Sequence, residues 1–228
     1  MNLVPGGCYS ALDIGARDGH FSKLLTGKFQ FVTALDLDMP SISHPNIKCV
    51  KGNIAKLQFD DNSFDCVFCA EVIEHIPAKS LSQACSELSR VCKKYLIIGV
   101  PYKQDIRVGR TTCYSCGKKN PPWGHINTFD INKLKNLFPL LDVEKISYVG
   151  DTNISTNFIS TFLMDLAGNP YGTYEQDEQC IYCSQKLMPP SGRNILQKIL
   201  TKVAIYIEHF QKPFVVAHPQ WIHILFKK

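Results

Sequence analysis

The sequence predicts an α/β protein built on a mostly parallel β-sheet with helices on both faces. Two observations lead to this fold class. Short apolar runs rich in β-branched residues alternate with segments of helical periodicity, and no long polar or repetitive segment interrupts the 228 residues. The expected strands lie, in chain order, at residues 9–14, 31–36, 47–52, 64–70, 95–100, 143–149 and 221–227. Because a chain of this length can bury one sizeable core, we expect residues 1–228 to form a single domain.

Helical periodicity is clearest in three segments. After the fourth strand, Ser80 and Gln83 have the spacing of a capping box, and an apolar stripe follows them. A shorter helix is expected after Asp130. Apolar residues spaced by three and four predict a long amphipathic helix over 195–210. The leading interpretation is that this helix covers the core. A homodimer interface and docking on a membrane surface are the alternatives.

Composition narrows the classes of function. The 25 Lys and Arg residues against 20 Asp and Glu give a net charge of +5, and the basic residues are too scattered to grip an extended RNA. Neither a signal peptide nor a transmembrane run is recognisable. Six of the ten cysteines lie in apolar strand or helix patterns and four form two Cys-x-x-Cys pairs, which favours a reducing, cytoplasmic location.

The most informative stretch is LDIGARDGHFSKLL, residues 12–25. A buried strand is expected to end at Asp13, and Gly15 would let the backbone turn tightly beside a ligand. Gly19 is expected to open a helix that packs through Phe21, Leu24 and Leu25. The next strand ends in Asp36, where a carboxylate can accept hydrogen bonds from two ribose hydroxyls. Strand, turn, helix, strand and acid in this order indicate a nucleoside-binding site.

The charge of the turn decides between two cofactor classes. A dinucleotide site has the pattern G-x-G-x-x-G, with a helix N-terminus facing the diphosphate. Here the residues read D-I-G-A-R-D-G, so the middle glycine is missing and an acid precedes the turn. Asp13 would repel a diphosphate but suits the cationic aminoacyl end of S-adenosylmethionine. The pattern therefore favours the methyl donor.

On these residues the chain resembles the class I S-adenosylmethionine-dependent methyltransferases, over roughly residues 9–149 and the last strand. That family has the pattern acid-x-Gly-x-Gly-x-Gly, which Asp13, Gly15 and Gly19 match, while Arg17 occupies the middle glycine position. The resemblance implies a Rossmann-like, seven-stranded sheet whose last strand runs antiparallel. It also implies that the cofactor is S-adenosylmethionine.

The resemblance assigns further cofactor contacts. Asp36 matches the ribose-binding acid, and its neighbour Leu37 belongs to the same site. Asn53 and Ile54 match the place where a polar residue contacts adenine and an apolar one packs on it. Glu71 falls at the end of the fourth strand, beside the cofactor. Each of these residues also has a plain structural interpretation, since an acid can cap a turn and Asn53 can be a loop asparagine.

Two cysteine pairs, Cys113–Cys116 and Cys180–Cys183, have the spacing of metal knuckles. Four thiolates make a closed, tetrahedral zinc site of the structural kind, because no coordination position is left open for catalysis. The pairs lie in expected insertions at residues 102–128 and 150–218, which leave the carboxyl edge of the sheet. We therefore expect one zinc ion to join both insertions. A redox disulfide and free thiols are the alternatives.

Two histidines are candidates for the base that would take a proton from the methyl acceptor. Transfer to an alcohol or a protonated amine needs a base, and both His75 and His125 fall in loops at the carboxyl edge. His125 could act as the base, orient the acceptor or hydrogen-bond within its loop, whereas His75 could simply stabilise its own loop. Glu74 and Tyr102 are nearby alternatives. The sequence Asn120-Pro-Pro-Trp123 imitates a signature of amino-directed methyltransferases, but it follows the wrong strand for that role.

We expect the acceptor to be a small metabolite or a sugar-containing natural product, methylated on oxygen or nitrogen. One alternative is an RNA- or protein-directed methyltransferase whose zinc knuckle grips the polymer. A non-catalytic cofactor-binding module is another, and the departure at Arg17 favours it.

Overall fold

The computed structural model describes residues 3–228. The chain divides into two compact units, each described by itself. The first contains the residues up to 102 together with 129–150 and 220–228, and the second contains 103–128 and 151–219. The second unit is thus made of the two stretches in which the sequence places insertions. The expectation of one domain carrying both insertions stays a prediction.

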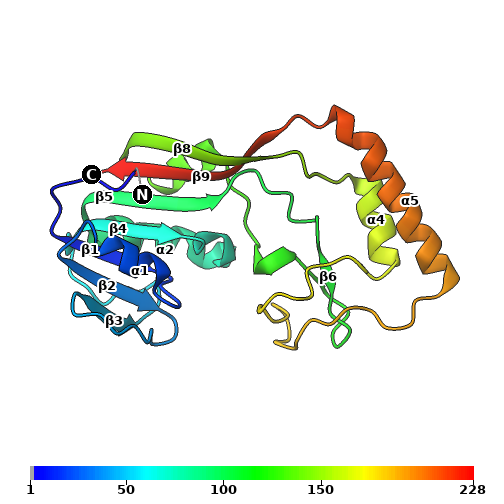
Figure 1. Ribbon diagram of the computed structural model, residues 1–228, viewed down its shortest axis with the longest axis horizontal. Coiled ribbons are helices and arrows are strands. Elements are labelled where there is room, and N and C mark those ends of the chain that lie inside the picture. The colour runs from blue at the N-terminus through cyan, green and yellow to red at the C-terminus, as the bar shows by residue number, and fades with distance from the viewer. Residues whose placement is uncertain (1–2) are drawn as a thin grey trace. The chain divides into compact units, whose positions relative to one another are not determined.

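A seven-stranded sheet forms the centre of the first unit (Figure 1). Its order is β3-β2-β1-β4-β5-β9-β8. Strands β1 to β5 pair in parallel, whereas β9 runs antiparallel to β5. This arrangement confirms the predicted fold class. The bounds are β1 Ser10–Ile14, β2 Phe31–Asp36, β3 Ile47–Lys51, β4 Phe64–Ala70, β5 Cys92–Pro101, β8 Asp142–Thr152 and β9 His218–Lys227.

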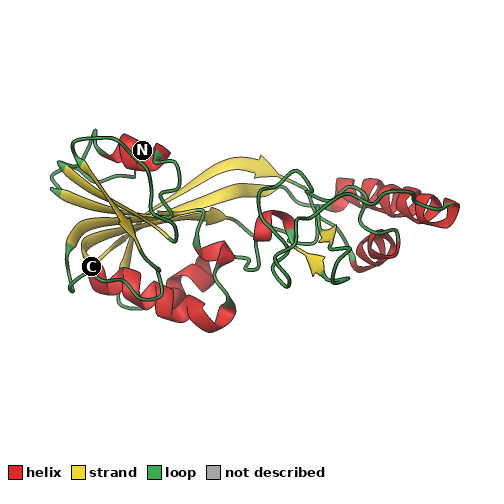
Figure 2. Ribbon diagram, turned by 90° about the horizontal axis from the view of Figure 1, so that it is seen from below, coloured by secondary structure: helices red, strands yellow, loops and turns green. Residues whose placement is uncertain are grey.

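The sheet is buried on both faces because successive side chains of a strand point to opposite sides. On one face, Leu12 and Ile14 of β1 join a large cluster with the helices α2 (Ala78–Val91) and α3 (Ile131–Leu137). On the other, Ala11 joins a smaller cluster with Leu25 of α1 (His20–Leu25). Figure 2 shows helices on both sides of the sheet. All seven residues of β4 are buried, as expected for a central parallel strand.

Two local predictions about helices are wrong. Helix α2 begins at Ala78 after Pro77, so Ser80 lies inside its first turn and no side chain caps the helix. Proline suits this boundary because its ring fixes φ and its missing N–H needs no partner. In the six-residue helix α1, Ser22 and Leu25 are buried, while Phe21 and Leu24 remain exposed. The face that packs is therefore rotated from the one expected. Helix α3 begins as predicted, with Asp130 accepting a hydrogen bond from Lys133 N.

Besides the helix predicted over 195–210, the second unit contains elements that the sequence pattern did not indicate. A short hairpin joins β6 (Thr111–Thr112) to β7 (Lys119–Asn120), and α4 (Phe158–Leu166) packs along α5 (Ile195–Gln211). Figures 1 and 2 both draw α4 and α5 side by side. Short 3₁₀ turns lie at Pro122–Gly124 and Lys212–Phe214. The small core of this unit is formed by Cys113, Tyr174, Cys180 and Leu187.

The amphipathic helix predicted over 195–210 is present as α5, but its expected role in covering the core is wrong. Its large apolar side chains, among them Ile195, Tyr206 and Phe210, are exposed. The residues it buries are the smaller Thr201 and Ala204. Helical periodicity identifies an apolar face, but it does not say what that face contacts.

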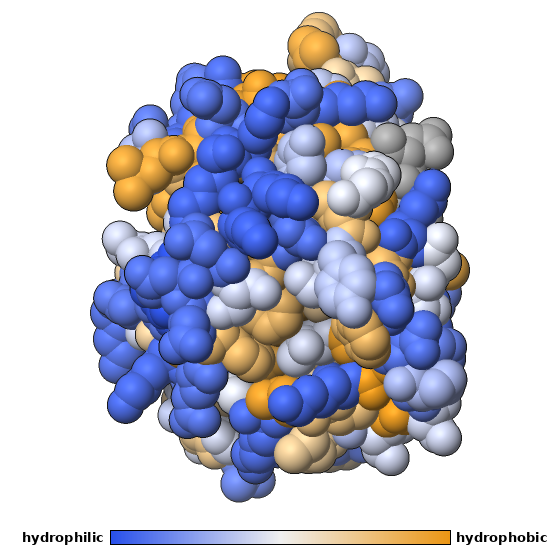
Figure 3. Space-filling view, turned by 90° about the vertical axis from the view of Figure 1, so that its left-hand side faces the viewer, coloured by the Kyte–Doolittle hydropathy of each residue, from blue (hydrophilic) through white to orange (hydrophobic). Residues whose placement is uncertain are grey.

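Figure 3 views the molecule from the left-hand side of Figure 1, where hydrophilic side chains cover most of the surface and hydrophobic ones form separate patches. Within residues 3–228, no helix combines the length and the apolar character needed to cross a membrane.

Candidate functional site

The glycine turn lies between β1 and α1, at the carboxyl edge of the sheet. Gly15 and Gly19 have φ values of +76° and +80°, in the left-handed region that favours glycine. A Cβ at Gly15 would overlap Val72 Cγ2, so this position has no room for a side chain. Arg17 also has a positive φ, +42°, although it is not glycine. The backbone at Arg17 therefore keeps a glycine-like conformation where the sequence departs from the family pattern.

Asp13 lies beneath this turn and only 2% of it is exposed. Its carboxylate accepts a hydrogen bond from Ser22 Oγ of α1. Burial raises the pKa of Asp13 to about 6, the Ser22 hydrogen bond opposes that rise and the nearby Asp36 adds to it. At neutral pH the group is mainly ionised. It therefore places a negative charge under the turn, where little water screens it.

Asp36, at the end of β2, is tied into the same turn. Its two carboxylate oxygens accept hydrogen bonds from Arg17 N at 2.9 Å and from Leu37 N at 2.6 Å. The backbone N–H groups of Gly15 and Ala16 donate to Leu35 O, which holds the turn against β2. Leu37 itself is exposed, so it offers an apolar surface beside the acid. The structure thus brings together the predicted cofactor residues of β1 and β2.

Asn53 and Ile54 follow β3 at the same edge of the sheet. Ile54 is buried in the large cluster, whereas Asn53 is exposed. The side-chain oxygen of Asn53 accepts a hydrogen bond from Ala55 N at 2.8 Å, which is a local turn contact. Its Nδ2 group is the part of the side chain that could reach an acceptor nitrogen of adenine.

Two glutamates follow β4. Glu71 has a φ of +60°, and its N–H donates to Gly99 O of β5 at 3.0 Å. Although Glu71 reaches the surface, desolvation by the surrounding protein raises its pKa to about 7. Glu74 is completely buried in the 3₁₀ turn Ile73–His75, and burial raises its pKa to about 8. Because Glu74 is mainly protonated at neutral pH, it is poorly suited to act as the base.

The two candidate histidines belong to different units. His75 ends the 3₁₀ turn of the first unit and is partly buried. His125, in the second unit, is buried, and its Nδ1 lies 2.8 Å from Oε1 of Gln104. An amide oxygen only accepts hydrogen bonds, so Nδ1 of His125 is the donor in this contact. Tyr102, the other alternative, is buried at the end of β5 with its ring 5.3 Å from that of Tyr148.

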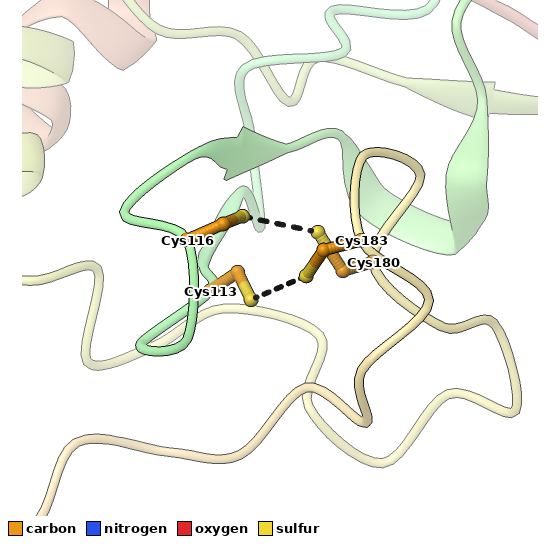
Figure 4. A group of neighbouring side chains, drawn as sticks. All are labelled: Cys113, Cys116, Cys180 and Cys183. Carbon is orange, nitrogen blue, oxygen red and sulfur yellow. Dashed lines mark hydrogen bonds between the residues drawn. The ribbon is translucent and has the colours of Figure 1, made fainter.

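The four predicted metal cysteines converge on one point in the second unit (Figure 4). Cys113 Sγ lies 3.6 Å from Cys183 Sγ, and Cys116 Sγ lies 3.7 Å from Cys180 Sγ. All four sulfur atoms lie within 4.8 Å of one another. In a tetrahedral site with zinc–sulfur bonds of about 2.3 Å, neighbouring sulfur atoms are about 3.8 Å apart. The donor set and its spacing therefore fit a zinc ion, and a closed disulfide would need sulfur atoms about 2 Å apart.

The two cysteine loops have the same backbone design. In each, the N–H four residues after the first cysteine donates to that cysteine's carbonyl: Gly117 to Cys113 and Ser184 to Cys180, at 2.7 and 2.8 Å. Gly117 and Ser184 both have positive φ, +70° and +57°, which turns the chain back around the thiols. Burial alone would raise the pKa of Cys180, but backbone hydrogen bonds from Tyr182 and Cys183 hold it below the usual value of a thiol. Such N–H groups stabilise a thiolate and support metal binding.

Asn120 joins the two cysteine loops. It is buried at the end of β7, its Oδ1 accepts a hydrogen bond from Ile181 N at 2.9 Å, and its Nδ2 donates to Lys118 O at 3.3 Å. The asparagine of the Asn120-Pro-Pro-Trp123 segment therefore has a structural role beside the thiols.

Sequence reasoning missed several residues that shape these sites. Ser22 was unremarkable within its helix, and Val72 is one apolar residue among many. Gln104 lies 21 positions from His125, and Asn120 lies 61 from Ile181. In one sequence, contacts at such separations leave no periodic signal. Of these residues, Ser22 alone could have been noticed from the sequence, because it is a polar residue on the side of a short helix that faces the sheet.

Comparison with known proteins supports the resemblance to methyltransferases. Residues 12–98 match the family model described as "Methyltransferase domain". This segment runs from β1 into β5 and includes every proposed cofactor residue, from Asp13 to Glu71. No curated protein is similar enough to this chain to count as a relative.

Solved structures share the fold at low identity. An S-adenosylmethionine-dependent methyltransferase from Archaeoglobus fulgidus is 18% identical, with a TM-score of 0.53 over 97% of this chain and 87% of the other. The N-methyltransferase NodS from Bradyrhizobium japonicum is 12% identical, with a TM-score of 0.51 over 98% and 87%. The [4+2]-cyclase SpnF is 13% identical, with a TM-score of 0.55 over 99% and 76%. At these identities the likeness establishes the fold alone.

Proposed function

Because this chain belongs to the class I S-adenosylmethionine-dependent methyltransferases, we propose that it methylates an oxygen or nitrogen atom of a small acceptor, a metabolite or a sugar-containing natural product. The proposal that the acceptor is small rests on the burial of His125, whose Nδ1 donates a hydrogen bond to Gln104. A buried imidazole suits a molecule that can enter a pocket better than it suits an extended polymer.

The residues around the glycine turn would hold the cofactor. Asp36 would accept hydrogen bonds from the ribose hydroxyls, and Asn53 with Ile54 would contact adenine. Asp13 and Glu71 would supply the negative potential that a sulfonium and an ammonium group require. Gly15 and Gly19 would let the backbone approach the ligand. When bound, S-adenosylmethionine supplies a methyl group attached to a positively charged sulfur.

The remaining tasks belong to the chain's own side chains, which orient the acceptor and take its proton. We propose that Nε2 of His125 takes the proton from the acceptor, because Nδ1 already donates a hydrogen bond to Gln104. His75 is the second candidate. Removing a general base lowers turnover by roughly 10²–10⁴-fold.

The first experiment identifies the acceptor. The purified chain is incubated with methyl-labelled S-adenosylmethionine and fractionated cell extract, and the labelled product is identified by mass. Turnover is then measured for His125→Gln, His125→Ala and His75→Gln at saturating donor. We expect a loss of about 100-fold or more at His125 and a small effect at His75. Unchanged turnover in both His125 variants would exclude base catalysis by this residue.

We also propose that the four cysteines hold one structural zinc ion. The sulfur spacing and the two matching backbone loops support this assignment. A closed set of four thiolates stabilises a small domain without taking part in the reaction. Protein purified without chelator should contain about one zinc ion per chain. A content below a tenth of that would overturn the assignment, and a Cys180→Ser, Cys183→Ser variant is the matched control.

One observation favours a second candidate function, a polymer-directed methyltransferase. Each cysteine loop exposes an aromatic ring, Tyr114 on one and Tyr182 on the other, and Lys118 Nζ lies 6.0 Å from the Tyr182 ring centre. Exposed aromatic rings beside a cation can stack on nucleobases. RNA binding that weakens steeply with salt and is lost in Tyr114→Ala, Tyr182→Ala would support this candidate. Absence of binding at low salt would leave the small acceptor as the better proposal.

A further inference from the structure

The helix pair α4–α5 has polar contacts between its helices and exposes large apolar side chains. Polar contacts join the two helices where α4 begins and α5 ends: Thr156, just before α4, has its Oγ1 2.6 Å from Ser160 Oγ and 3.2 Å from Glu208 Oε1. At the N-cap of α4, Asn157 Nδ2 donates to Gln211 Oε1 at 2.6 Å. Burying hydroxyl, amide and carboxylate groups is favourable because they satisfy one another. Polar contacts therefore help to hold the two helices together at this end of the pair.

The outward surface is apolar along the whole of both helices. On α5 the exposed residues recur at intervals of three and four, which places them on one side of the helix. Tyr206 and Phe210 are 73% and 72% exposed. We call the exposed apolar residues of both helices and the following turn the outer stripe: Phe158, Ile159, Phe162, Leu166, Ile195, Leu196, Ile199, Val203, Tyr206, Phe210 and Phe214. Soluble surfaces rarely expose so large a contiguous apolar area without a use for it.

The charges around the outer stripe have one sign. Lys198 and Lys202 are exposed and lie one turn apart on the same side of α5, and Lys212 follows the helix end. In residues 158–166 and 195–211, which the structure describes throughout, the acidic residues are Asp165 and Glu208. Asp165 is paired with Arg110 at 2.9 Å and Lys119 at 2.7 Å, while Glu208 bonds Thr156 on the inner side. The outward surface therefore combines apolar groups with unneutralised lysines.

We propose that the outer stripe docks on an anionic phospholipid surface, with α4 and α5 lying in the plane of the interface. This proposal goes beyond the methyl-transfer function and does not depend on it. Apolar side chains would enter the boundary between headgroups and acyl chains, and the lysines would pair with lipid phosphates. A second copy of the chain would present the same lysines, so it offers these charges no partner.

Vesicle sedimentation tests the proposal with the full chain. The probes are vesicles of pure phosphatidylcholine and vesicles containing 30% phosphatidylglycerol, at constant salt. We expect clear binding to the anionic vesicles and at least about tenfold weaker binding to the neutral ones. Lys198→Glu, Lys202→Glu should weaken binding about thirtyfold or more, since each lysine near an anionic surface is worth about fivefold. Lys28→Glu, Lys145→Glu, which changes exposed lysines of the first unit, is the matched control.

The apolar part is tested by Tyr206→Ser, Phe210→Ser, which we expect to abolish vesicle binding. Its control is Leu140→Ser, because Leu140 is 84% exposed and lies outside the outer stripe. Unchanged thermal unfolding and binding of S-adenosylhomocysteine show that the variants fold. Failure of the folded wild-type chain to bind anionic vesicles would overturn the proposal. So would a dimer in velocity sedimentation that Tyr206→Ser, Phe210→Ser dissociates while vesicle binding is unaffected.

Discussion

The Asp13 carboxylate is buried in the protein and has almost no contact with water. Burial raises its pKa to about 6, so the carboxylate is ionised at neutral pH but loses its charge in mild acid. Family members place an acid at this point of the turn, and here the structure shows that its direct partner is Ser22. Its effect on a cationic ligand is therefore mainly electrostatic.

The first prediction concerns pH. As the pH falls from 7 to 5, Asp13 is protonated, its negative charge disappears and the affinity for S-adenosylmethionine should fall by about tenfold. Glu71, whose pKa is about 7, titrates in the same range and contributes its own step. In Asp13→Asn the step near pH 6 should vanish while the Glu71 step persists, as measured by calorimetry. The exposed Asp38→Asn is the control. An identical pH profile in the wild-type chain and Asp13→Asn would refute this role.

A second prediction at the residue scale tests the turn itself. Gly15→Ala adds a Cβ that overlaps Val72 and forces an L-residue into the left-handed region. We expect it to lower the free energy of unfolding by about 2 kcal/mol or more. Adding Val72→Ala should recover part of this loss, because it removes the overlap but leaves the backbone strain. Urea unfolding of the two single variants and the double variant measures the coupling. Strictly additive effects would show that Val72 does not limit this position.

At the scale of elements, the two cysteine loops show how the backbone positions the four thiols of the proposed zinc site. Each loop turns its thiols inward by the same backbone hydrogen bond, and Asn120 links one loop to the other. The thiols are thus held near their final positions by contacts that do not involve the metal. Preorganisation of this kind keeps a site intact when one ligand is briefly released.

The third prediction follows from Asn120. In Asn120→Ala the N–H of Ile181 loses its acceptor, so the second loop should become looser. We expect zinc to transfer to a competing chelator at least about tenfold faster than in the wild-type chain, a typical effect of removing a supporting contact. Asn136→Ala, an exposed position of α3, is the control. Equal transfer rates in the wild-type chain and Asn120→Ala would mean that this hydrogen bond does not support the site.

At the scale of the whole molecule, the proposed cofactor residues and the other proposed sites lie in different units. Every proposed cofactor residue lies in the first unit, whereas the cysteine centre, His125 and the helix pair lie in the second. Among residues 3–228, the first unit has a large and a smaller apolar cluster, whereas the one cluster of the second unit is the small one around the cysteines. We therefore expect the stability of the second unit, but not that of the first, to depend strongly on the proposed zinc ion.

This difference gives the fourth prediction. Chelation should lower the thermal transition of the second unit by many degrees and leave that of the first nearly unchanged. Binding of S-adenosylhomocysteine should survive the treatment, because its proposed contacts are all in the first unit. Calorimetry of the same sample before and after chelation, followed by zinc re-addition, measures both effects. Loss of both transitions together would show that the units do not unfold separately.

The sequence by itself determined the features that depend on local patterning. The seven strands, the tight turn at Gly15, the helix that opens at Gly19 and the acid ending β2 each follow from residues close together in the chain. The alternation of strand and helix was sufficient to predict the fold class, because a parallel sheet buries continuous apolar runs under helices.

Tertiary structure alone decided which residues meet across long separations and which apolar faces are covered. The sequence predicted that the two cysteine pairs meet, but the hydrogen bond from Ile181 to Asn120 that links their loops depends on how two distant segments pack. The stripe on α5 could be recognised in the sequence, yet its large apolar side chains are exposed, and the residues that the helix buries are Thr201 and Ala204. Periodicity shows that a helix has an apolar side, but burial also requires an apolar surface opposite it.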